Sequence, residues 1–433
     1  MRRARVLILD TGREWGGGTN SLLEFLRRMD REQFEMLAAF SHDYPKGRVS
    51  TIRRELEHLG VEFLHLGEPV VSPLEKAKKE IGRTLLSFSS RLRRRFLSSW
   101  DLRVRKQPAS EKIEKILRER EIDLLYTNNQ PSANLEGFLA TEREGIPVVA
   151  HLRSVASLAP HEVELANRAV ERFICVSHAV VDHYRRQGIS PEKMSVVHNG
   201  IALDEGEGGV GRQEEAREYR KKWGVAGGGI AVGIIGSLLR RKGHRYFLEA
   251  ARVVKQRSPL PVVFVIVGEG PERGRIEALC RSSGLSGDVH LTGFLEDPLP
   301  LIRALDVVVM ASDEEGFPRV LLEAMLVGKP VAAFSLASVA ELVEDGRTGF
   351  LAPLHDSTDL AEKILRLVTD KDLREQMGAR GRERVRENFS VDRYVRGVED
   401  VLRDVVKRRR RTLPRDGGCS GKVPVAGRTS GAQ

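Results

Sequence analysis

The sequence has few of the residues that mark disulfide-stabilised, metal-binding or membrane-spanning proteins. Its 433 residues include three cysteines, Cys175, Cys280 and Cys419, at unrelated spacings. No apolar run approaches the ~20 residues that a transmembrane helix needs. The start, MRRARVLILD, has only a four-residue apolar stretch before an aspartate. We therefore expect no disulfide framework, no bound metal, no transmembrane helix and no signal peptide, and we expect a cytoplasmic location.

The dinucleotide fingerprint G-x-G-x-x-G is also missing, although glycine clusters follow two predicted strands. Trp15-Gly16-Gly17-Gly18 follows the first strand, and Gly268-Glu269-Gly270-Pro271 follows a later one. Neither cluster has the required spacing. A nicotinamide-dependent oxidoreductase is therefore a poor explanation of this sequence.

The length and the hydrophobic pattern predict two domains. A chain of 433 residues with 41% hydrophobic content is long enough for two domains of about 200 residues each. Short β-branched runs alternate with amphipathic helical segments in both halves, which predicts an α/β fold with parallel sheets. We expect a first domain over 1–203, a glycine-rich charged linker over 204–228, a second domain over 229–390, a helix over 391–406 and a disordered tail over 407–433.

The net charge of +10 is concentrated in two segments. Residues 76–106 contain eleven Lys and Arg against two acids, and residues 407–433 contain eight against one. The first segment lies in an insertion over about 68–108, where Leu85, Phe88, Leu92 and other apolar residues are mixed with cations. A basic amphipathic helix of this kind suits an anionic membrane surface or a lipid-linked acceptor, and a solvated helix packed on the domain is the alternative.

The segment 312–350 has the clearest functional pattern. A short β-branched strand at 306–310 is followed by two glutamates, Gly316, Phe317 and Pro318, and then by a helical pattern over 319–327. The free N–H groups of Phe317, Arg319 and Val320 would point outward from this helix start, where anions and hydroxyl oxygens bind. The helix is apolar apart from Glu323, and such a carboxylate needs a partner. The partner is either a salt bridge or loop hydrogen bond, or the vicinal hydroxyls of a ribose.

Three further sites have two interpretations each. The loop Gly236-Ser237-Leu238-Leu239-Arg240-Arg241-Lys242-Gly243 lies at the carboxyl end of a predicted strand, where its cations fit a diphosphate or form a solvated basic turn. Gly17 and Gly18 allow a phosphate to approach the backbone, or form a flexible loop. His151 ends a strand, where a histidine binds ligand or serves as a structural hydrogen-bonding group.

The motifs together resemble the retaining glycosyltransferases of family four. The resemblance rests on Glu315-x7-Glu323 within EEGFPRVLLEAM, on GKPVAA and ELVEDGRTGFL after it, and on CVSHAVVDHY with VVHNGI before it, and it extends from about residue 6 to about residue 405. It implies the GT-B fold, in which two Rossmann-like domains face a central cleft. In that fold the N-terminal domain binds the acceptor, the C-terminal domain binds a nucleotide-diphosphate sugar, and the last helix crosses back to the N-terminal domain.

The resemblance also implies roles for individual residues. Glu315, His151 and Lys242 are the expected catalytic residues: Glu315 lies against the donor sugar, His151 meets its hydroxyls, and Lys242 neutralises the leaving diphosphate. Glu323 holds the ribose, and Arg240 or Arg241 replaces a family arginine at the position of Ser237. The full expected donor-binding set is Gly17, Gly18, Ser237, Arg240, Arg241, Lys242, Gly268, Gly270, Phe294, Glu315, Gly316, Phe317, Pro318, Arg319, Val320 and Glu323. Ala337-Ser338 replaces a glycine pair of the family near the donor sugar.

The implied activity is transfer of a sugar to an acceptor hydroxyl with retention of configuration and without a metal or other cofactor. We expect a role in cell-envelope or polysaccharide synthesis, a glycan or lipid-linked acceptor, and peripheral contact with the inner membrane face through 76–106 and 407–433. Nucleic acid is not expected as a partner, because no reading domain accompanies the basic tail. A nucleotide-sugar epimerase or phosphorylase of the same fold, and a non-catalytic sugar-nucleotide sensor, are the alternatives.

Overall fold

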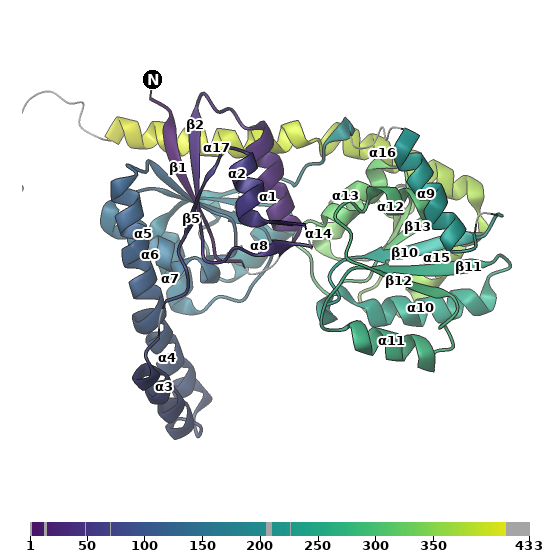
Figure 1. Ribbon diagram of the computed structural model, residues 1–433, viewed down its shortest axis with the longest axis horizontal. Coiled ribbons are helices and arrows are strands. Elements are labelled where there is room, and N and C mark those ends of the chain that lie inside the picture. Colours follow the sequence, from purple (N-terminus) through teal and green to yellow (C-terminus); the bar gives the residue numbers. More distant parts are fainter. Residues whose placement is uncertain are drawn as a thin grey trace, which may run out of the picture.

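The chain forms two α/β lobes, each built on a parallel sheet (Figure 1). The computed structural model describes residues 2–12, 15–47, 49–69, 71–204, 210–225 and 227–412. The first lobe contains a seven-stranded sheet and the second a six-stranded sheet. The expected fold class, two Rossmann-like domains, is therefore confirmed.

The first sheet has the strand order β5-β2-β1-β6-β7-β8-β9, with every described pair parallel. Its strands are β1 (Ala4–Asp10), β2 (Phe34–Phe40), β5 (Glu62–His65), β6 (Leu124–Thr127), β7 (Val148–Leu152), β8 (Val170–Cys175) and β9 (Met194–Val196). The helices of this lobe are α1 (Gly17–Arg28), α2 (Ile52–His58), α5 (Gln107–Glu119), α6 (Leu135–Glu144), α7 (Pro160–Ala169) and α8 (His178–Arg186). A small hairpin, β3 (Pro45–Lys46) with β4 (Ser50–Thr51), follows β2.

The second sheet has the order β12-β11-β10-β13-β14-β15, also parallel. Its strands are β10 (Ile230–Ile235), β11 (Val262–Val267), β12 (Val289–Gly293), β13 (Val307–Met310), β14 (Val331–Phe334) and β15 (Gly349–Ala352). Its helices are α9 (Val210–Lys222), α10 (His244–Arg257), α11 (Arg273–Ser282), α12 (Leu299–Ala304), α13 (Arg319–Leu326), α14 (Ala337–Ala340), α15 (Ser357–Thr369) and α16 (Lys371–Asn388). The strands are buried along most of their length, as expected for sheets covered on both faces.

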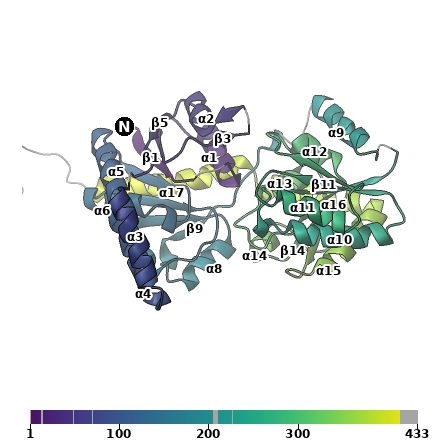
Figure 2. The same ribbon diagram turned by 60° about the horizontal axis from the view of Figure 1, so that its bottom comes forward.

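The last helix, α17 (Val391–Thr412), returns from the second lobe and packs on α1, β7 and β8 of the first (Figures 1 and 2). It continues six residues beyond the predicted end at 406, which corrects the predicted start of the tail. The extension is held because Arg409 and Arg410 donate to the backbone carbonyls of Asp123 and Arg2. Residues 413–433, the rest of the predicted tail, lie outside the described part of the chain.

The segment predicted as a linker contains a packed helix. Helix α9 lies against α12, and Trp223 just after it is buried. Arg220 of α9 also donates to the carboxylate of Asp306 at 2.8 Å and to the carbonyl of Ala304. Residues 210–225 therefore belong structurally to the second lobe.

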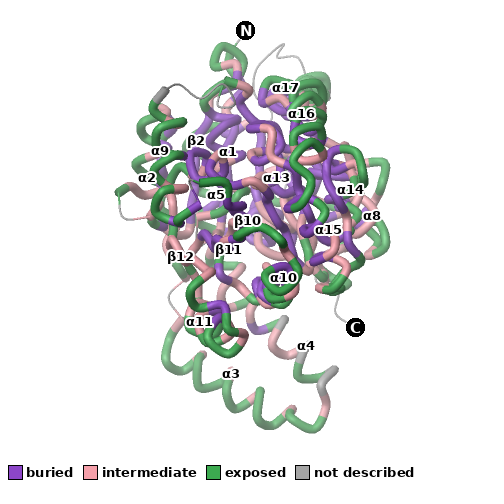
Figure 3. The backbone as a smooth tube through the Cα atoms, turned by 90° about the vertical axis from the view of Figure 1, so that its right-hand side faces the viewer, coloured by how far each residue is buried: buried purple, intermediate pink, exposed green. Residues whose placement is uncertain are grey.

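The basic insertion is a pair of helices and not the single helix that its pattern predicted. The helices α3 (Pro73–Leu85) and α4 (Ser90–Asp101) pack against each other and project away from the first lobe (Figure 1). A Cβ at Gly82 would lie 2.2 Å from the ring of Phe96, so this glycine allows the two helices to approach closely. Helix α3 is largely exposed in Figure 3.

Candidate functional site

The two lobes meet where chain segments leave the carboxyl ends of their central strands. This is the edge of the sheet at which open α/β folds bind their ligands. Ser177, after β8, donates from its hydroxyl to the carbonyl of Gly316 at 2.8 Å and accepts from the N–H of Val180, so it is the N-cap of α8. Asn199 donates to the carbonyl of Phe317 at 3.0 Å. These bonds hold the turn before α13 against the first lobe.

The turn packs too tightly for any side chain at Gly316. A Cβ there would lie 2.2 Å from the carbonyl oxygen of Arg153, which belongs to the other lobe. Phe317 is buried against the rings of His198 and Phe389. Pro318 occupies the N-cap position, so α13 begins one residue later, at Arg319. The expected donor-binding turn is thus also a contact between the lobes.

Glu315 and Lys242 come together at this junction. The ammonium of Lys242 lies 2.5 Å from Oε1 of Glu315, and the hydroxyl of Ser312 donates to the same oxygen at 2.8 Å. Ser338 donates to the backbone carbonyl of Glu315 at 2.7 Å. Two of the three predicted catalytic residues are therefore in contact, in a position that is mostly shielded from solvent.

Glu323 has a cationic neighbour on its own helix. Nη2 of Arg319, one turn earlier, lies 3.7 Å from Oε1 of Glu323, and both side chains are nearly nine-tenths buried. Arg319 also donates to the carbonyl of Gly200 in the first lobe at 3.4 Å, and its Nε is buried without a hydrogen-bond partner among the described atoms. The buried carboxylate thus lies close to a cation, which is one of the two arrangements expected from the sequence.

The basic loop after β10 leaves its charges accessible. Ser237, Arg240 and Arg241 are exposed and Lys242 is half-buried. Gly268, with φ of +142°, packs against this loop so closely that a Cβ would lie 2.0 Å from the carbonyl oxygen of Gly236. Gly270 packs in the same way on Leu238. These two glycines of the predicted donor set therefore support the cationic loop.

The remaining predicted residues also lie near the junction. A Cβ at Gly17 would be 3.9 Å from Arg319, and one at Gly18 would be 3.6 Å from Arg153. Phe294, after β12, is partly exposed, and its ring approaches Gly47 in the loop between β3 and β4 of the other lobe. Val320 follows Arg319 in the first turn of α13 and is half-buried.

His151 is fully buried. Its Nδ1 lies 2.6 Å from the hydroxyl of Tyr126, and its Nε2 has no hydrogen-bond partner among the described atoms. Burial, reinforced by the nearby charge of Arg153, lowers the pKa of His151 well below its usual value, so the ring is neutral. A neutral ring with a free nitrogen suits a hydroxyl partner, and full burial limits what can reach it.

Arg153 organises a buried polar cluster that the sequence patterns did not single out. It donates to Asn128 and Asn199 at 3.0 and 3.1 Å and to the hydroxyl of Tyr394 on α17 at 2.9 Å. Asp10 accepts from Asn128 at 3.1 Å, and burial raises its pKa. The position of Arg153 beside His151 was visible in the sequence, but Tyr394 lies 241 residues away and gave no local signal.

Glu341 forms a second connection between the lobes. Its carboxylate accepts from the backbone N–H groups of His178 and Ala179, in the first turn of α8, at 2.9 and 2.8 Å, and lies 3.0 Å from Nε2 of His198. Burial alone would raise the pKa of Glu341, but these hydrogen bonds outweigh burial and lower it. A residue of the second lobe thus caps a helix of the first.

The described residues contain no group of three or more His, Cys, Asp or Glu residues arranged to hold a metal ion. None of the described helices is both long and apolar enough to cross a bilayer.

Two family models match successive parts of the chain. The model "Glycosyltransferase Family 4" matches residues 15–205, and the model "Glycosyl transferases group 1" matches residues 215–384. The first match covers the first lobe and the second covers most of the other lobe.

Several relatives of this chain are named as glycosyltransferases. The alpha-D-kanosaminyltransferase of Streptomyces kanamyceticus is 30% identical over 258 residues, which are 55% of this chain and 66% of that protein. The UDP-Gal:alpha-D-GlcNAc-diphosphoundecaprenol alpha-1,3-galactosyltransferase of Escherichia coli is 26% identical over 306 residues, which are 67% of this chain and 78% of that protein.

Solved structures share the fold. Anabaena HepE in complex with UDP and glucose superposes with a TM-score of 0.75 at 22% identity and covers 93% of this chain and 100% of its own. A glycosyltransferase from Rickettsia africae has the same TM-score at 18% identity and covers 94% of this chain and 100% of its own. With a glycosyltransferase family model on each lobe and this fold throughout, the chain is a GT-B glycosyltransferase that uses a nucleotide-sugar donor, and its first lobe matches family 4.

Proposed function

We propose that the protein transfers a sugar from a nucleotide-diphosphate sugar to an acceptor hydroxyl with retention of configuration and without a metal ion. The pairing of Lys242 with Glu315 beside the inter-lobe turn carries this proposal. It places a cation for the leaving diphosphate next to a carboxylate for the sugar hydroxyls. The name of the E. coli relative and the UDP-bound HepE structure make UDP sugars the first donors to test.

The cations of the loop after β10 stabilise the leaving group. Lys242 is nearest to the junction, and the exposed Arg240 and Arg241 add charge where Ser237 offers none. Fixed positive charges at a departing diphosphate stabilise the transition state as a metal ion does in other enzymes. This supports metal-independent catalysis.

The arrangement of Glu315 supports same-face transfer. Lys242 and Ser312 both contact its Oε1. A carboxylate oxygen that already has two partners is better suited to positioning the sugar than to attacking it as a nucleophile. We propose that the acceptor attacks from the face that the diphosphate leaves. His151 contributes its free Nε2 to a sugar hydroxyl, and Glu323 binds the ribose by exchanging its contact with Arg319 for the two hydroxyls.

The acceptor is a glycan or a lipid-linked sugar of the cell envelope or of a polysaccharide. The names of the E. coli relative and of the Staphylococcus aureus poly(ribitol-phosphate) alpha-N-acetylglucosaminyltransferase support this class. We propose that the α3–α4 pair contacts an anionic membrane at its inner face, because Leu85 and Phe88 are exposed among its lysines and arginines.

A thermal-shift screen of nucleoside diphosphates and their sugars tests the donor site, since a ligand raises the unfolding midpoint by mass action. We expect at least one UDP or other nucleotide sugar to raise the midpoint, and Glu323→Ala to abolish the shift. Glu362→Gln, on the outer face of the second lobe, should leave it unchanged. An undiminished shift with Glu323→Ala would place the ribose elsewhere.

Turnover distinguishes the alternatives. A transferase releases nucleoside diphosphate when an acceptor is added, whereas an epimerase releases none and a phosphorylase consumes phosphate. A sensor binds donor without turnover, and its Glu315→Gln variant binds as well as the parent. For a transferase, Glu315→Gln should reduce kcat by about 100-fold, in the range seen when a transition-state partner is removed.

A further inference from the structure

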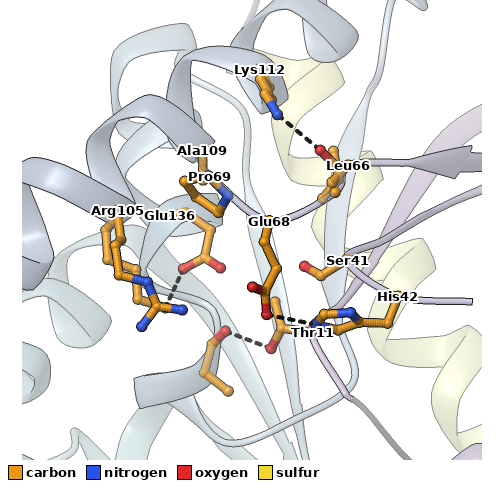
Figure 4. Close-up of a pocket in the computed structure, with 13 residues that line it drawn as sticks. Thr11, Ser41, His42, Leu66, Glu68, Pro69, Arg105, Ala109, Lys112 and Glu136 are labelled. Atoms are coloured by element: carbon orange, nitrogen blue, oxygen red, sulfur yellow. Dashed lines mark hydrogen bonds and ion pairs between the residues drawn. The ribbon is translucent and has the colours of Figure 1, made fainter. Parts of the chain in front are cut away.

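Two features lie outside the contacts described so far, and the first is a cavity of about 170 Å³ between the end of β5 and the start of α5 (Figure 4). The cations of its lining are matched in number by three carboxylates, one of them just outside the lining: Arg105, Lys106 and Lys112 with Glu68, Glu136 and Asp101. Lys106 lies 2.8 Å from Glu136, and Arg105 lies 3.3 Å from Asp101. The charges of this cavity are therefore balanced by its own neighbours.

The second feature is His355, in the turn that follows β15. Its φ of +66° lies in the left-handed region, which is uncommon for residues other than glycine. Among the non-glycine residues that the structure describes, only Glu121 shares a positive φ. A conformation of this kind persists where surrounding contacts maintain it, and it occurs often at functional sites. The side-chain contacts of His355 therefore bear on its role.

The His355 ring contacts two elements, and each of them leads to one residue of the candidate site. Its Nε2 lies 3.0 Å from Oδ1 of Asp313, two residues before Glu315. Because an ionised carboxylate only accepts hydrogen bonds, this nitrogen carries the proton. The ring also stacks on Tyr246, with the centroids 5.0 Å apart and the planes at 21°. Tyr246 lies in the first turn of α10, which begins two residues after Lys242.

The backbone joins the same two loops. The N–H of Asp313 donates to the carbonyl of Arg241 at 2.8 Å, and the next residue, Lys242, pairs with Glu315. These contacts close a ring that runs from one loop to the other and back. The side chain of Glu315 is 12% exposed and that of His355 is 48% exposed, so His355 holds this ring from its solvent side.

The His355 contacts are poorly explained as a contribution to stability. An ion pair at a partly exposed position contributes little, and a left-handed residue that carries a Cβ costs free energy. The same contacts are explained if they fix the position of the loop after β13 relative to the loop after β10.

We propose that His355 is a positioning residue, which keeps Glu315 and Lys242 aligned with the donor through Asp313 and Tyr246. The inference rests on the proposed transferase function. Small displacements of groups around a reacting centre reduce the rate strongly, because the transition state depends on their alignment. Charge on the diphosphate grows as its bond to the sugar breaks, so a loss of alignment affects kcat more than the KM for the donor.

Substitutions of His355 test the proposal by steady-state kinetics. His355→Gly removes both side-chain contacts and suits a positive φ, so the fold should be retained. We expect it to lower kcat at least tenfold and to change the KM for the donor less than threefold. His355→Gln keeps an N–H donor for Asp313 and should recover at least a third of the lost activity on a logarithmic scale.

A double-mutant cycle tests whether Asp313 is the partner. Residues that act through one contact are not additive, so Asp313→Ala combined with His355→Gly should lose no more than about threefold beyond His355→Gly alone. Glu121→Gly is the matched control, since Glu121 also has a positive φ and forms exposed ion pairs, with Arg2 and Arg5. Its kcat should stay within twofold of the wild type.

A kcat of His355→Gly within twofold of the wild type would overturn the proposal. So would losses from His355→Gly and Asp313→Ala that multiply in the double variant. A fall in kcat matched by an equal rise in KM would also overturn it, because His355 would then support donor binding and not alignment.

Labelling of Lys242 measures the alignment without turnover. Reductive methylation with formaldehyde, followed by mass spectrometry, reports how accessible each amine is. Release of Lys242 from Glu315 in His355→Gly should raise its labelling rate at least threefold, whereas Lys115, an exposed lysine of α5, should keep its rate.

The two measurements separate the possible failures. A wild type that turns over, with a His355→Gly variant of equal kcat, would reject the role of His355 alone. A wild type that transfers no sugar from any nucleotide sugar would reject the proposed function. The labelling rate then decides the role of His355 in holding the pair: an unchanged rate overturns it, and a raised rate supports it.

Discussion

At the scale of single residues, buried ionisable groups at the lobe junction determine how the protein responds to pH. His151 is neutral because it is enclosed between Tyr126 and Tyr394 and lies near the charge of Arg153. Its pKa in the unfolded chain is near 6.5, so below that pH the unfolded state binds a proton that the folded state does not.

We therefore expect His151 to make the folded state less stable as pH falls below about 6.5, with full stability above it. The loss attributable to one such group is at most about 1.4 kcal/mol per pH unit. Urea unfolding of the wild type and of His151→Phe at pH 7 and pH 5 measures the effect as the difference between their pH slopes. Equal slopes would show that His151 accepts a proton in the folded state.

The identity of several site residues was predictable at this scale, but their pairings were not. Glu323 stands out in the sequence because a carboxylate is costly on an otherwise apolar helix, whereas Lys242 and Glu315 stand out in charged loops that follow predicted strands. The contact between Lys242 and Glu315 joins residues 73 apart, so it depends on the parallel pairing of β10 with β13. No local pattern contains that information.

At the scale of elements, α8 is capped by Ser177 of its own lobe and receives a second cap, Glu341, from the other lobe. Helix N-terminal caps contribute about 0.5–2 kcal/mol, and a carboxylate there also interacts favourably with the helix dipole. We expect Glu341→Ala to lower the free energy of unfolding by about 1–2 kcal/mol, measured by urea denaturation. Glu383→Gln, on the exposed side of α16, is the control and should change it by less than ~0.5 kcal/mol. An equal effect of the two would mean that Glu341 contributes no cap.

The α3–α4 pair presents apolar side chains to solvent, including Phe88 at 78% exposure and Leu85 at 68%. Burial of such side chains in lipid is favourable, and nearby lysines and arginines attract anionic headgroups. We expect co-sedimentation with phosphatidylglycerol vesicles, reduced at least tenfold by the double change Leu85→Asp and Phe88→Asp. Neutral phosphatidylcholine vesicles are the control.

Vesicle binding that the double variant retains would place the membrane contact elsewhere on the protein. The basic, amphipathic character of this element was predicted from the sequence, but the prediction of a single helix was wrong. The structure has two helices separated by the turn 86–89, and they pack closely where Gly82 meets Phe96, a contact between positions 14 residues apart.

At the scale of the whole molecule, the two lobes are joined by hydrogen bonds and by the return of α17. Gly316 lies at the centre of that junction, and its missing Cβ allows the carbonyl of Arg153 to approach. We expect Gly316→Ala to push the lobes apart and reduce kcat at least tenfold, because reacting groups contributed by both lobes lose their alignment.

Gly274→Ala is the matched control. This glycine is on α11 with open space around its Cβ position, and alanine there should preserve kcat and add up to ~1 kcal/mol of stability. Steady-state kinetics with the donor found in the screen and small-angle scattering measure the two effects. A Gly316→Ala variant with normal kcat and an unchanged radius of gyration would show that the junction tolerates displacement.

The fold class and most strands were determined by the sequence itself. Residues 34–40, 124–127, 230–235 and 262–267 form strands, in agreement with the alternation of short apolar runs and helical patterns that predicts an α/β fold. The short strands β14 and β15 and the hairpin of β3 with β4 were not predicted, since each has only two to four residues and depends on its neighbours for pairing.

Only the tertiary structure decided which groups meet. Arg153 with Tyr394, Glu341 with α8, and the cavity between β5 and α5 join parts of the chain that are between 46 and 241 residues apart. The periodicity of apolar side chains indicates which face of an element is buried, but it does not indicate which distant element packs on that face. The residue types of the candidate site could therefore be predicted from the sequence. Their pairings could not, because they depend on how the two lobes pack against each other.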